Sequence, residues 1–261
     1  MKRDPGTKGM GMVPSWLPQL DAYDRVARLW PALLAMAPVL WAGPQVKGTI
    51  VHGGAASVFG SLGLAGACVV LLMNISRSRG RAIEPELIRR WDGWRTTGLL
   101  RHRDRVVDRF TKERYHKALT SLGKGLRLPT ESEETADPVQ ADERFRAATT
   151  RLIEKRRDHK YALLHKENAQ YGFRRNLLGL KPIALSLVAL ALTLDVAHWW
   201  LGLPAGEWGA AVAADVAVRT AVYLAVTADV MCAVGWLLFI RPDFVRTAAD
   251  EYALALFRTL D

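Results

Sequence analysis

The chain has 261 residues and a net charge of +10, with 50% apolar and 24% charged residues. This average is typical of a soluble protein, but the two classes are segregated along the chain, which argues against a single soluble core. Residues 29–76 contain one charged residue, Lys47, and residues 182–240 contain five. Residues 77–181 carry 26 Lys and Arg against 15 Asp and Glu, so this segment accounts for the whole net charge.

An apolar stretch at residues 28–76 predicts a first transmembrane hairpin, because a helix needs about 20 mostly apolar residues to cross a bilayer. Its first span, residues 28–46, includes Pro38, which removes a helix hydrogen bond and predicts a kink. The second span, residues 55–73, contains three glycines whose spacing favours close packing against another helix. These glycines are Gly60, Gly63 and Gly66.

Residues 77–181 predict a basic helical insert, since no sustained apolar–polar alternation indicates strands. Asp137 followed by Pro138 is typical of a helix start, and apolar residues at helical spacing follow to about residue 157. Two shorter helices are predicted at residues 84–94 and 111–122. The acidic, proline-flanked segment at residues 128–137 is expected to be a mobile loop.

A second transmembrane hairpin is predicted at residues 182–240, with spans at about 182–203 and 220–240. Asp195 and Asp229 lie near the middle of these spans, at depths that differ by about 3 Å if both helices are straight. A carboxylate at mid-bilayer costs roughly 2.5–3.5 kcal/mol, so both should face protein or water. The pair indicates either structural bonds between helices or a polar ion path. Asp215 and Arg219 are four residues apart, which predicts an ion pair near the outer surface.

The distribution of Lys and Arg predicts the orientation, since cytoplasmic loops carry the excess of these residues. The insert has 26, whereas the two outer loops offer only Lys47 and Arg219. The N-terminal segment 1–27, the insert and the C-terminal tail 241–261 are therefore expected in the cytoplasm. The sequence thus predicts an all-α integral membrane protein of the bacterial inner membrane, with four transmembrane helices in two hairpins.

Clusters of basic side chains are candidates for binding anions. Each basic residue near an anionic leaflet contributes roughly 1 kcal/mol, and the arginine fork also matches phosphate oxygens. Anionic lipid headgroups are the first expectation, a phosphate-bearing ligand or a cytosolic protein the second, and nucleic acid the last, since no nucleic-acid motif accompanies the charge. The candidate residues are Arg101, Arg103, Arg105, Lys155, Arg156, Arg157, Arg174 and Arg175.

Motifs for catalysis are incomplete. His102-Arg103-Asp104 matches the tripeptide of a kinase catalytic loop, but Arg109 stands where a kinase has Asn, and a glycine-rich phosphate loop is missing. Cys68 and Cys232 are isolated in apolar segments, and the histidines lack the spacing of a zinc site. The sequence therefore favours a protein without catalytic residues, cofactor or metal ion, although a hydrolase site assembled by the fold stays open.

Three segments resemble an uncharacterised family of bacterial multi-span membrane proteins: ENAQYGFRRNLLGLKP at residues 167–182, RRWDGW at residues 89–94 and LLRHRD at residues 99–104. That family has no established activity, so the resemblance implies a multi-span fold only. The layout is also similar to that of membrane effectors of bacterial anti-phage defence, by architecture alone.

These features favour a membrane protein that couples a cytosolic signal to membrane permeability, as a defence effector would. Four spans with few polar residues cannot enclose a wide pore, so a homo-oligomer is expected. Two alternatives stay open. One is a membrane anchor for a cytosolic partner, and the other is a membrane-bound enzyme that acts on lipids or phosphoesters.

Overall fold

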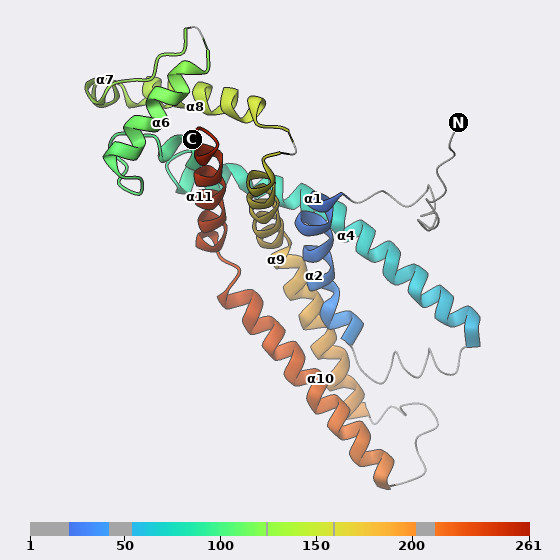
Figure 1. Ribbon diagram of the computed structural model, residues 1–261. Helices are drawn as coiled ribbons and strands as arrows, with labels where there is room; N and C mark the ends of the chain where they lie inside the picture. The colour runs from blue at the N-terminus through green and yellow to red at the C-terminus, as the bar shows by residue number, and fades with distance from the viewer. Residues whose placement is uncertain (1–20, 42–53, 124, 159, 202–211) are drawn as a thin grey trace, which may run out of the picture.

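The computed structural model describes residues 21–41, 54–123, 125–158, 160–201 and 212–261, and the regular structure in these ranges is all helical (Figure 1). For residues 40–41, 54–62, 198–199, 201 and 212–219 it describes the backbone only. In chain order the helices are α1 (Ala22–Asp24), the π-helical turn η1 (Arg25–Leu29), α2 (Trp30–Trp41), α4 (Gly54–Arg90), α5 (Arg95–Gly98), α6 (Arg109–Ser121), α7 (Glu131–Ala136), α8 (Pro138–Lys155), α9 (Ala162–Leu201), α10 (Val212–Leu238) and α11 (Pro242–Arg258). The predicted all-α class is confirmed for these residues.

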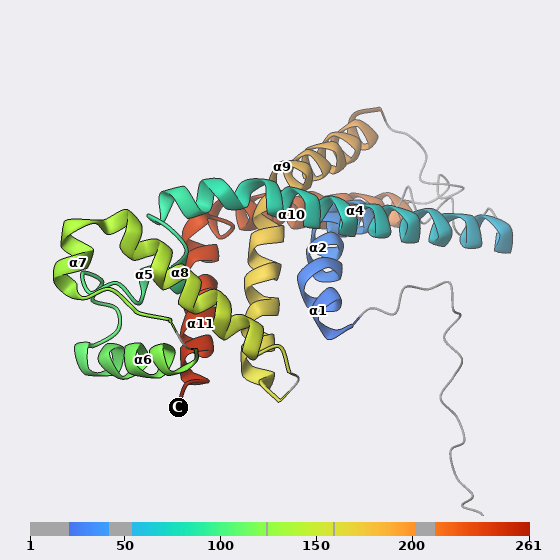
Figure 2. The same ribbon diagram turned by 90° about the horizontal axis from the view of Figure 1, so that it is seen from above.

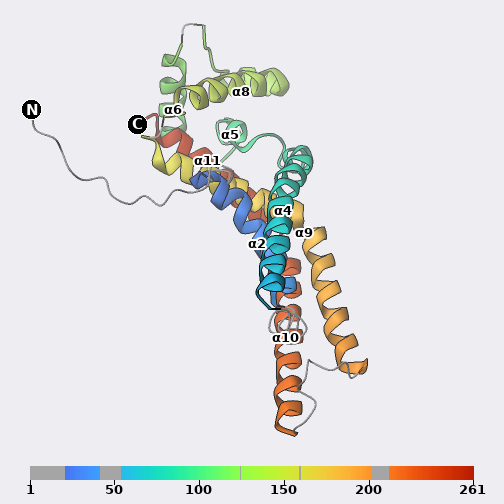
Figure 3. The same cartoon turned by 90° about the vertical axis from the view of Figure 1, so that its right-hand side faces the viewer.

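Four helices, α2, α4, α9 and α10, form an elongated stem. α9 is the axis, because it packs against α2, α4, α10 and also α11; its 40 residues make it about 60 Å long. Figures 1 and 3 show α9 and α10 extending beyond α2 at the end far from the C-terminus. The stem core is apolar and consists of Ala32, Ala35, Met36, Leu72, Met73, Leu177, Leu180, Ala184, Trp236 and Ile240.

Two helices of the described chain are long and apolar enough to cross a membrane, at Ala162–Ala197 in α9 and Thr220–Leu238 in α10. Neither α2 nor the described part of α4 meets the same criterion, so two of the four predicted spans have such a counterpart. Most residues in the two apolar windows are not covered by protein. The large apolar side chains exposed along them include Leu190, Leu194, Val196, Leu224, Val230, Met231, Val234, Leu237 and Leu238.

The backbones of α4 and α9 touch where Gly80 meets Gly179. A Cβ atom on Gly179 would lie 2.6 Å from the amide nitrogen of Gly80, which leaves no room for a side chain. Close packing was predicted for other glycines of the same helix. Among the described residues, Gly63 and Gly66 would meet no atom within 4 Å of an added Cβ, and the surroundings of Gly60 lie outside the described side chains, so the predicted close packing stays a prediction.

Short capped helices build a head at one end of the stem (Figure 2), which we define as residues 91–161 together with α11. Asp108 accepts a hydrogen bond from the Thr111 amide and so starts α6. Asp137 accepts from the Gln140 amide and starts α8, with Pro138 in the first turn. The structure therefore places a helix start at the Asp-Pro signal, as predicted.

Two local predictions for the insert are wrong. The acidic segment expected to be a mobile loop contains α7, which begins with a capping box between Thr130 and Glu133. The helix expected at residues 84–94 is not separate, because α4 continues from the stem through Pro85 to Arg90. Asp92 and Gly93, with φ of 57° and 111°, then turn the chain into the head.

α11 belongs to the core of the head, although the sequence placed residues 241–261 in a tail. Ala253, Leu256 and Phe257 are fully buried in the same apolar cluster as Leu119 of α6 and Phe145 of α8. Figure 1 shows the C-terminus lying beside α6 and α8. The structure thus joins the insert and the C-terminal segment in one folded unit.

Candidate functional site

The contact between α9 and α10, which we call the seam, holds two acidic side chains. Its buried residues are Ala184, Val188, Ala191 and Asp195 on α9 and Val222, Ala225, Asp229 and Trp236 on α10. Spacings of three and four residues are typical of helices that pack side by side. Asp195 and Asp229 therefore occupy positions that otherwise hold alanine, valine or tryptophan.

Both carboxylates are buried, and each residue is 2% exposed. They are near enough that the charge of Asp195 acts on Asp229. The Oδ2 atom of Asp229 is buried and accepts no hydrogen bond from a described residue. A buried carboxylate oxygen that lacks such a bond favours the uptake of a proton or another cation, because the bare charge loses its hydration. The seam can therefore bind a cation, either a proton or a metal ion.

The other two polar residues predicted for the second transmembrane hairpin lie outside the described side chains. Asp215 and Arg219 lie among residues 212–219, whose side chains are outside the described part of the structure. The predicted ion pair between them stays a prediction.

The passage from α10 to α11 forms an elbow, which we define as residues 237–244, and two basic residues of α9 hold it. Lys181 donates from Nζ to the carbonyl oxygens of Ile240 at 2.8 Å and Leu237 at 3.3 Å, at the end of α10. Arg174 donates from Nη1 to the carbonyl of Phe244 at 3.1 Å, in the first turn of α11. The two bonds from Lys181 satisfy carbonyls that the end of α10 leaves open. Together with the bond from Arg174 they fix both arms of the elbow to the axis helix.

Arg175 joins α9 to α4 rather than facing the lipid. Its Nη1 atom lies 2.7 Å from Oε1 of Glu84, and the hydroxyl of Tyr171 donates to the same oxygen at 2.8 Å. At the next residue, Nδ2 of Asn176 donates to the carbonyl of Ala27 at 2.7 Å. Ala27 belongs to the π-helical turn η1, so this bond joins that turn to the axis helix.

Arg101 was predicted to bind anions, but its guanidinium is buried in the head and is 5% exposed. Nη1 lies 2.6 Å from Oδ2 of Asp92, and Nε donates to Oδ1 of Asp142 at 2.8 Å. The prediction of a headgroup or phosphate contact at Arg101 is therefore wrong for this conformation, because both faces of the fork already meet carboxylates.

The remaining basic candidates differ in their availability. Arg103 contacts Glu134 at 3.1 Å, Lys155 donates to the carbonyl of Leu122 at 2.7 Å, and Arg156 donates to the carbonyl of Thr259 at 3.1 Å. Arg105 and Arg157 are exposed, so these two arginines are the ones most available to an anion. The structure does not gather the eight predicted residues into one site.

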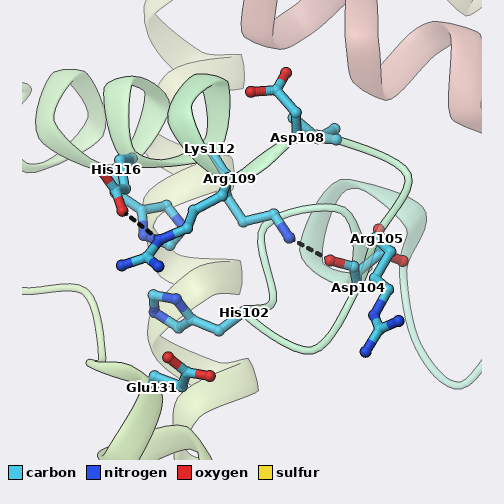
Figure 4. A pocket seen from close by; sticks show the side chains of 10 residues that line it. His102, Asp104, Arg105, Asp108, Arg109, Lys112, His116 and Glu131 are labelled. Atoms are coloured by element: carbon cyan, nitrogen blue, oxygen red, sulfur yellow. Dashed lines mark hydrogen bonds and ion pairs between the residues drawn. The ribbon is translucent and has the colours of Figure 1, made fainter.

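A cavity of about 380 Å³ lies in the head beside α6 (Figure 4). His102 and His116 face it with their rings edge to face, 4.9 Å apart. Each Nε2 atom lies within hydrogen-bond reach of a carbonyl, Pro129 at 3.0 Å and Leu100 at 2.8 Å. A neutral imidazole that donates from Nε2 keeps Nδ1 as an acceptor, so this wall of the cavity offers acceptors to a ligand.

Burial controls the charge of two groups beside this cavity. Burial lowers the pKa of His116, and the nearby His102 and Lys112 lower it further. Burial also lowers the pKa of Lys112, whose Nζ donates to the carbonyls of Arg101 at 2.7 Å and Asp104 at 2.5 Å. The described residues that line the cavity include no serine, threonine or cysteine, and most of them are acidic, basic or histidine side chains.

Sequence reasoning missed the residues that join the parts of the molecule, namely Lys181, Asn176, Gly80 and Gly179. Only Lys181 carried a visible signal, since a basic residue at the end of an apolar span often meets open carbonyls. Among the described residues, no group of three or more His, Cys, Asp or Glu side chains could hold a metal ion. Comparison with protein-family models, curated proteins and solved structures finds no match for the chain.

Proposed function

We propose that the chain is a four-span protein of the cell membrane whose cytosolic head controls a polar path along the α9–α10 seam. In this arrangement α2 and α4 form one transmembrane hairpin, and α9 and α10 form the other. The head and both termini face the cytoplasm, where the positive charge of residues 77–181 is favoured.

The exposed apolar surface of the stem supports the membrane part of this proposal. Leu190, Leu224 and Met231 are each more than half exposed, at 52%, 62% and 65%. Continuous apolar surface of this kind is costly in water and favourable in lipid. The apolar face of α4 continues the pattern, with Leu64 and Val70 exposed at 68% and 50%.

The proposed control by the head rests on one observation, namely that α11 belongs both to the head and to the elbow. Its last turns are buried in the core of the head, and its first turn continues from α10 through the elbow. A ligand or partner that moves the head must therefore move α11, and α11 pulls on the end of α10. Because α10 carries Asp229, such a movement changes the packing around the seam carboxylates.

A single chain leaves little room for a wide path, since the seam is lined by alanine, valine and tryptophan beside the two aspartates. Several copies would be needed to enclose one. The exposed apolar faces of α9 and α10 offer the surface for such an assembly, in competition with lipid.

Ion flux from vesicles tests the proposal. The full chain is reconstituted in anionic vesicles, and proton and K⁺ leakage are followed with and without inorganic phosphate as a probe of the head. Wild type should leak ions, and Arg174→Gln should change the rate several-fold because it releases one arm of the elbow. Arg246→Gln, on an exposed face of α11, should match wild type. Full reconstitution with no leakage in any of these samples would contradict the proposal.

A specific surface of the head favours an anchor for a cytosolic protein as the second candidate. Phe110 is 82% exposed and Val106, four residues before it, is 61% exposed, and exposed apolar side chains that adjoin one another can form an interaction site. In that case Phe110→Ser should abolish the capture of one defined partner in cells, while vesicles that contain the wild-type protein remain tight.

A further inference from the structure

Asp229 has the environment of a group that binds a cation. It is 2% exposed, and its buried Oδ2 atom accepts no hydrogen bond from the described part of the chain. The helices packed against α10 are α9 and α2. The titratable groups that act on this region from the described side chains are Asp195 on α9 and Cys232 on α10, whereas α2 offers none.

The surroundings favour a proton over a metal cation. A metal ion such as Ca²⁺ or Mg²⁺ requires about six or more oxygen ligands. The described seam offers the carboxylates of Asp195 and Asp229, and its other buried residues are apolar. No cluster of metal-binding side chains occurs among the described residues. A proton requires a single oxygen, and a protonated carboxyl group loses far less hydration on burial than a charged one.

We propose that Asp229 binds a proton at the α9–α10 seam and that its release or uptake changes the packing of the two helices. The neutral acid is compatible with a seam whose other buried residues are apolar. When Asp229 loses its proton to water, its charge is repelled by Asp195 and must be hydrated, so the helices separate. Proton binding thus deepens the proposed function, because it names the ion that the seam handles.

This inference rests on the part of the proposed function that places α9 and α10 in a bilayer, and it does not require control by the head. Infrared spectroscopy tests it on the full chain in lipid bilayers, since a protonated carboxyl group has a C=O stretch that a carboxylate lacks. At pH 7 the wild type should show this band, with a shift in D₂O. Asp229→Asn should remove it, and Asp229→Glu should retain it at a shifted position.

Asp243→Asn is the matched control, because Asp243 is exposed in the first turn of α11; it should leave the band unchanged. Asp195→Asn removes the repelling charge, so the band should vanish at a lower pH than in wild type. Absence of the band at pH 7 in protein with a native amide spectrum would overturn the proposal. Loss of the band on addition of Na⁺ or K⁺ at constant pH would also overturn it, in favour of a metal cation.

The two proposals can fail separately. A carboxyl band in vesicles that leak no ions would retain the proton site and contradict control of permeability. Leakage from vesicles whose protein shows no band would retain the permeability function and contradict the proton site.

Discussion

The guanidinium of Arg174 lies over the ring of Phe244, 4.5 Å from its centroid, and donates a 3.1 Å hydrogen bond to the carbonyl of the same residue. One side chain of the axis helix therefore binds α11 through both charge and packing. The sequence placed Arg174 at the lipid headgroups because of its position beside an apolar span. The structure gives the guanidinium a partner within the protein, so the residue fixes the elbow.

Arg101 should be a structural residue rather than an anion-binding one. Replacement by Gln should destabilise the head by about 2 kcal/mol, since hydrogen bonds to charged groups contribute roughly 1.5–3 kcal/mol. In this variant Asp142, whose side chain is 31% exposed, loses its ion pair with Arg101. Urea titration of the full chain in detergent, followed by proteolysis of the head, measures the change.

Arg105→Gln is the matched control for Arg101, because Arg105 is exposed. Its effect on stability should stay within about 0.5 kcal/mol, whereas its binding to anionic vesicles should weaken, more clearly at low salt. Weaker vesicle binding by Arg101→Gln at unchanged stability would contradict the structural role of Arg101.

Gly179 should not tolerate a methyl group. Gly179→Ala places a Cβ 2.6 Å from the backbone of Gly80, so α4 and α9 must separate, at a cost of roughly 1–3 kcal/mol. Gly235→Ala on α10 meets no atom within 4 Å and should be neutral or slightly stabilising. The midpoints of thermal unfolding in detergent distinguish the two variants. Equal midpoints would contradict the close crossing of α4 and α9.

The stability of the head should depend on pH through His116. Because burial lowers its pKa below the ordinary value of 6.5, the unfolded chain binds more protons than the folded one. Stability is therefore complete above pH 6.5 and falls as the pH drops from 6.5 toward the folded pKa. His116→Gln, which keeps a donor for the Leu100 carbonyl, should reduce this loss when urea unfolding is compared at pH 5 and pH 7.5. An equal loss in wild type and variant would contradict this assignment.

Local signals predicted much of the head, and long-range pairs could not be predicted. The Asp137-Pro138 start and the apolar spacing after it are encoded within a few residues, and α8 follows them. The capping box at Thr130 was equally local, but the acidic composition around it favoured a loop. By contrast, Arg95 pairs with Asp250, 155 residues away, and nothing near either residue identifies its partner.

At the seam, too, the sequence could not predict which side chains face one another. The hydropathy pattern predicted that Asp195 and Asp229 would avoid lipid, because a charge in hydrocarbon is costly. It could not specify which face of each helix turns inward, since the apolar residues surround both helices. For the same reason Gly63 and Gly66 were indistinguishable from Gly80 and Gly179, although among the described contacts the second pair is the one that lies at a helix crossing.

The topology can be tested by cysteine labelling of intact cells. In a background with Cys68→Ala and Cys232→Ala, single cysteines are placed at Thr130, in the head, and at Gly206, between α9 and α10. An impermeant thiol reagent should label position 206 before lysis and position 130 only after it. Labelling at position 130 but not at position 206 would reverse the orientation.

The carboxylates of the seam should control ion flux without being required for folding. Asn at position 195 or 229 keeps the size and polarity of the side chain but removes its charge, so either variant should change the leakage of protons from vesicles while expression stays near normal. Asp229→Leu is the sharper test. Because no hydrogen bond from a described residue to the buried Oδ2 atom is lost and the seam residues other than Asp195 are apolar, leucine should preserve or increase thermal stability while it abolishes flux.

A purely structural role predicts the opposite result for the same variant. If Asp229 bound a neighbouring helix, leucine would leave that partner unsatisfied and would destabilise the stem by about 1–3 kcal/mol, while Asn would have little effect on flux. Flux and thermal unfolding measured on the same vesicles for wild type, Asp195→Asn, Asp229→Asn, the double Asn variant and Asp229→Leu therefore distinguish the two roles.

If Asp195 and Asp229 act together, the double variant should change flux by no more than the stronger single variant, because removing the second member of a functional pair adds little. Effects that multiply would show that each carboxylate acts on a separate step.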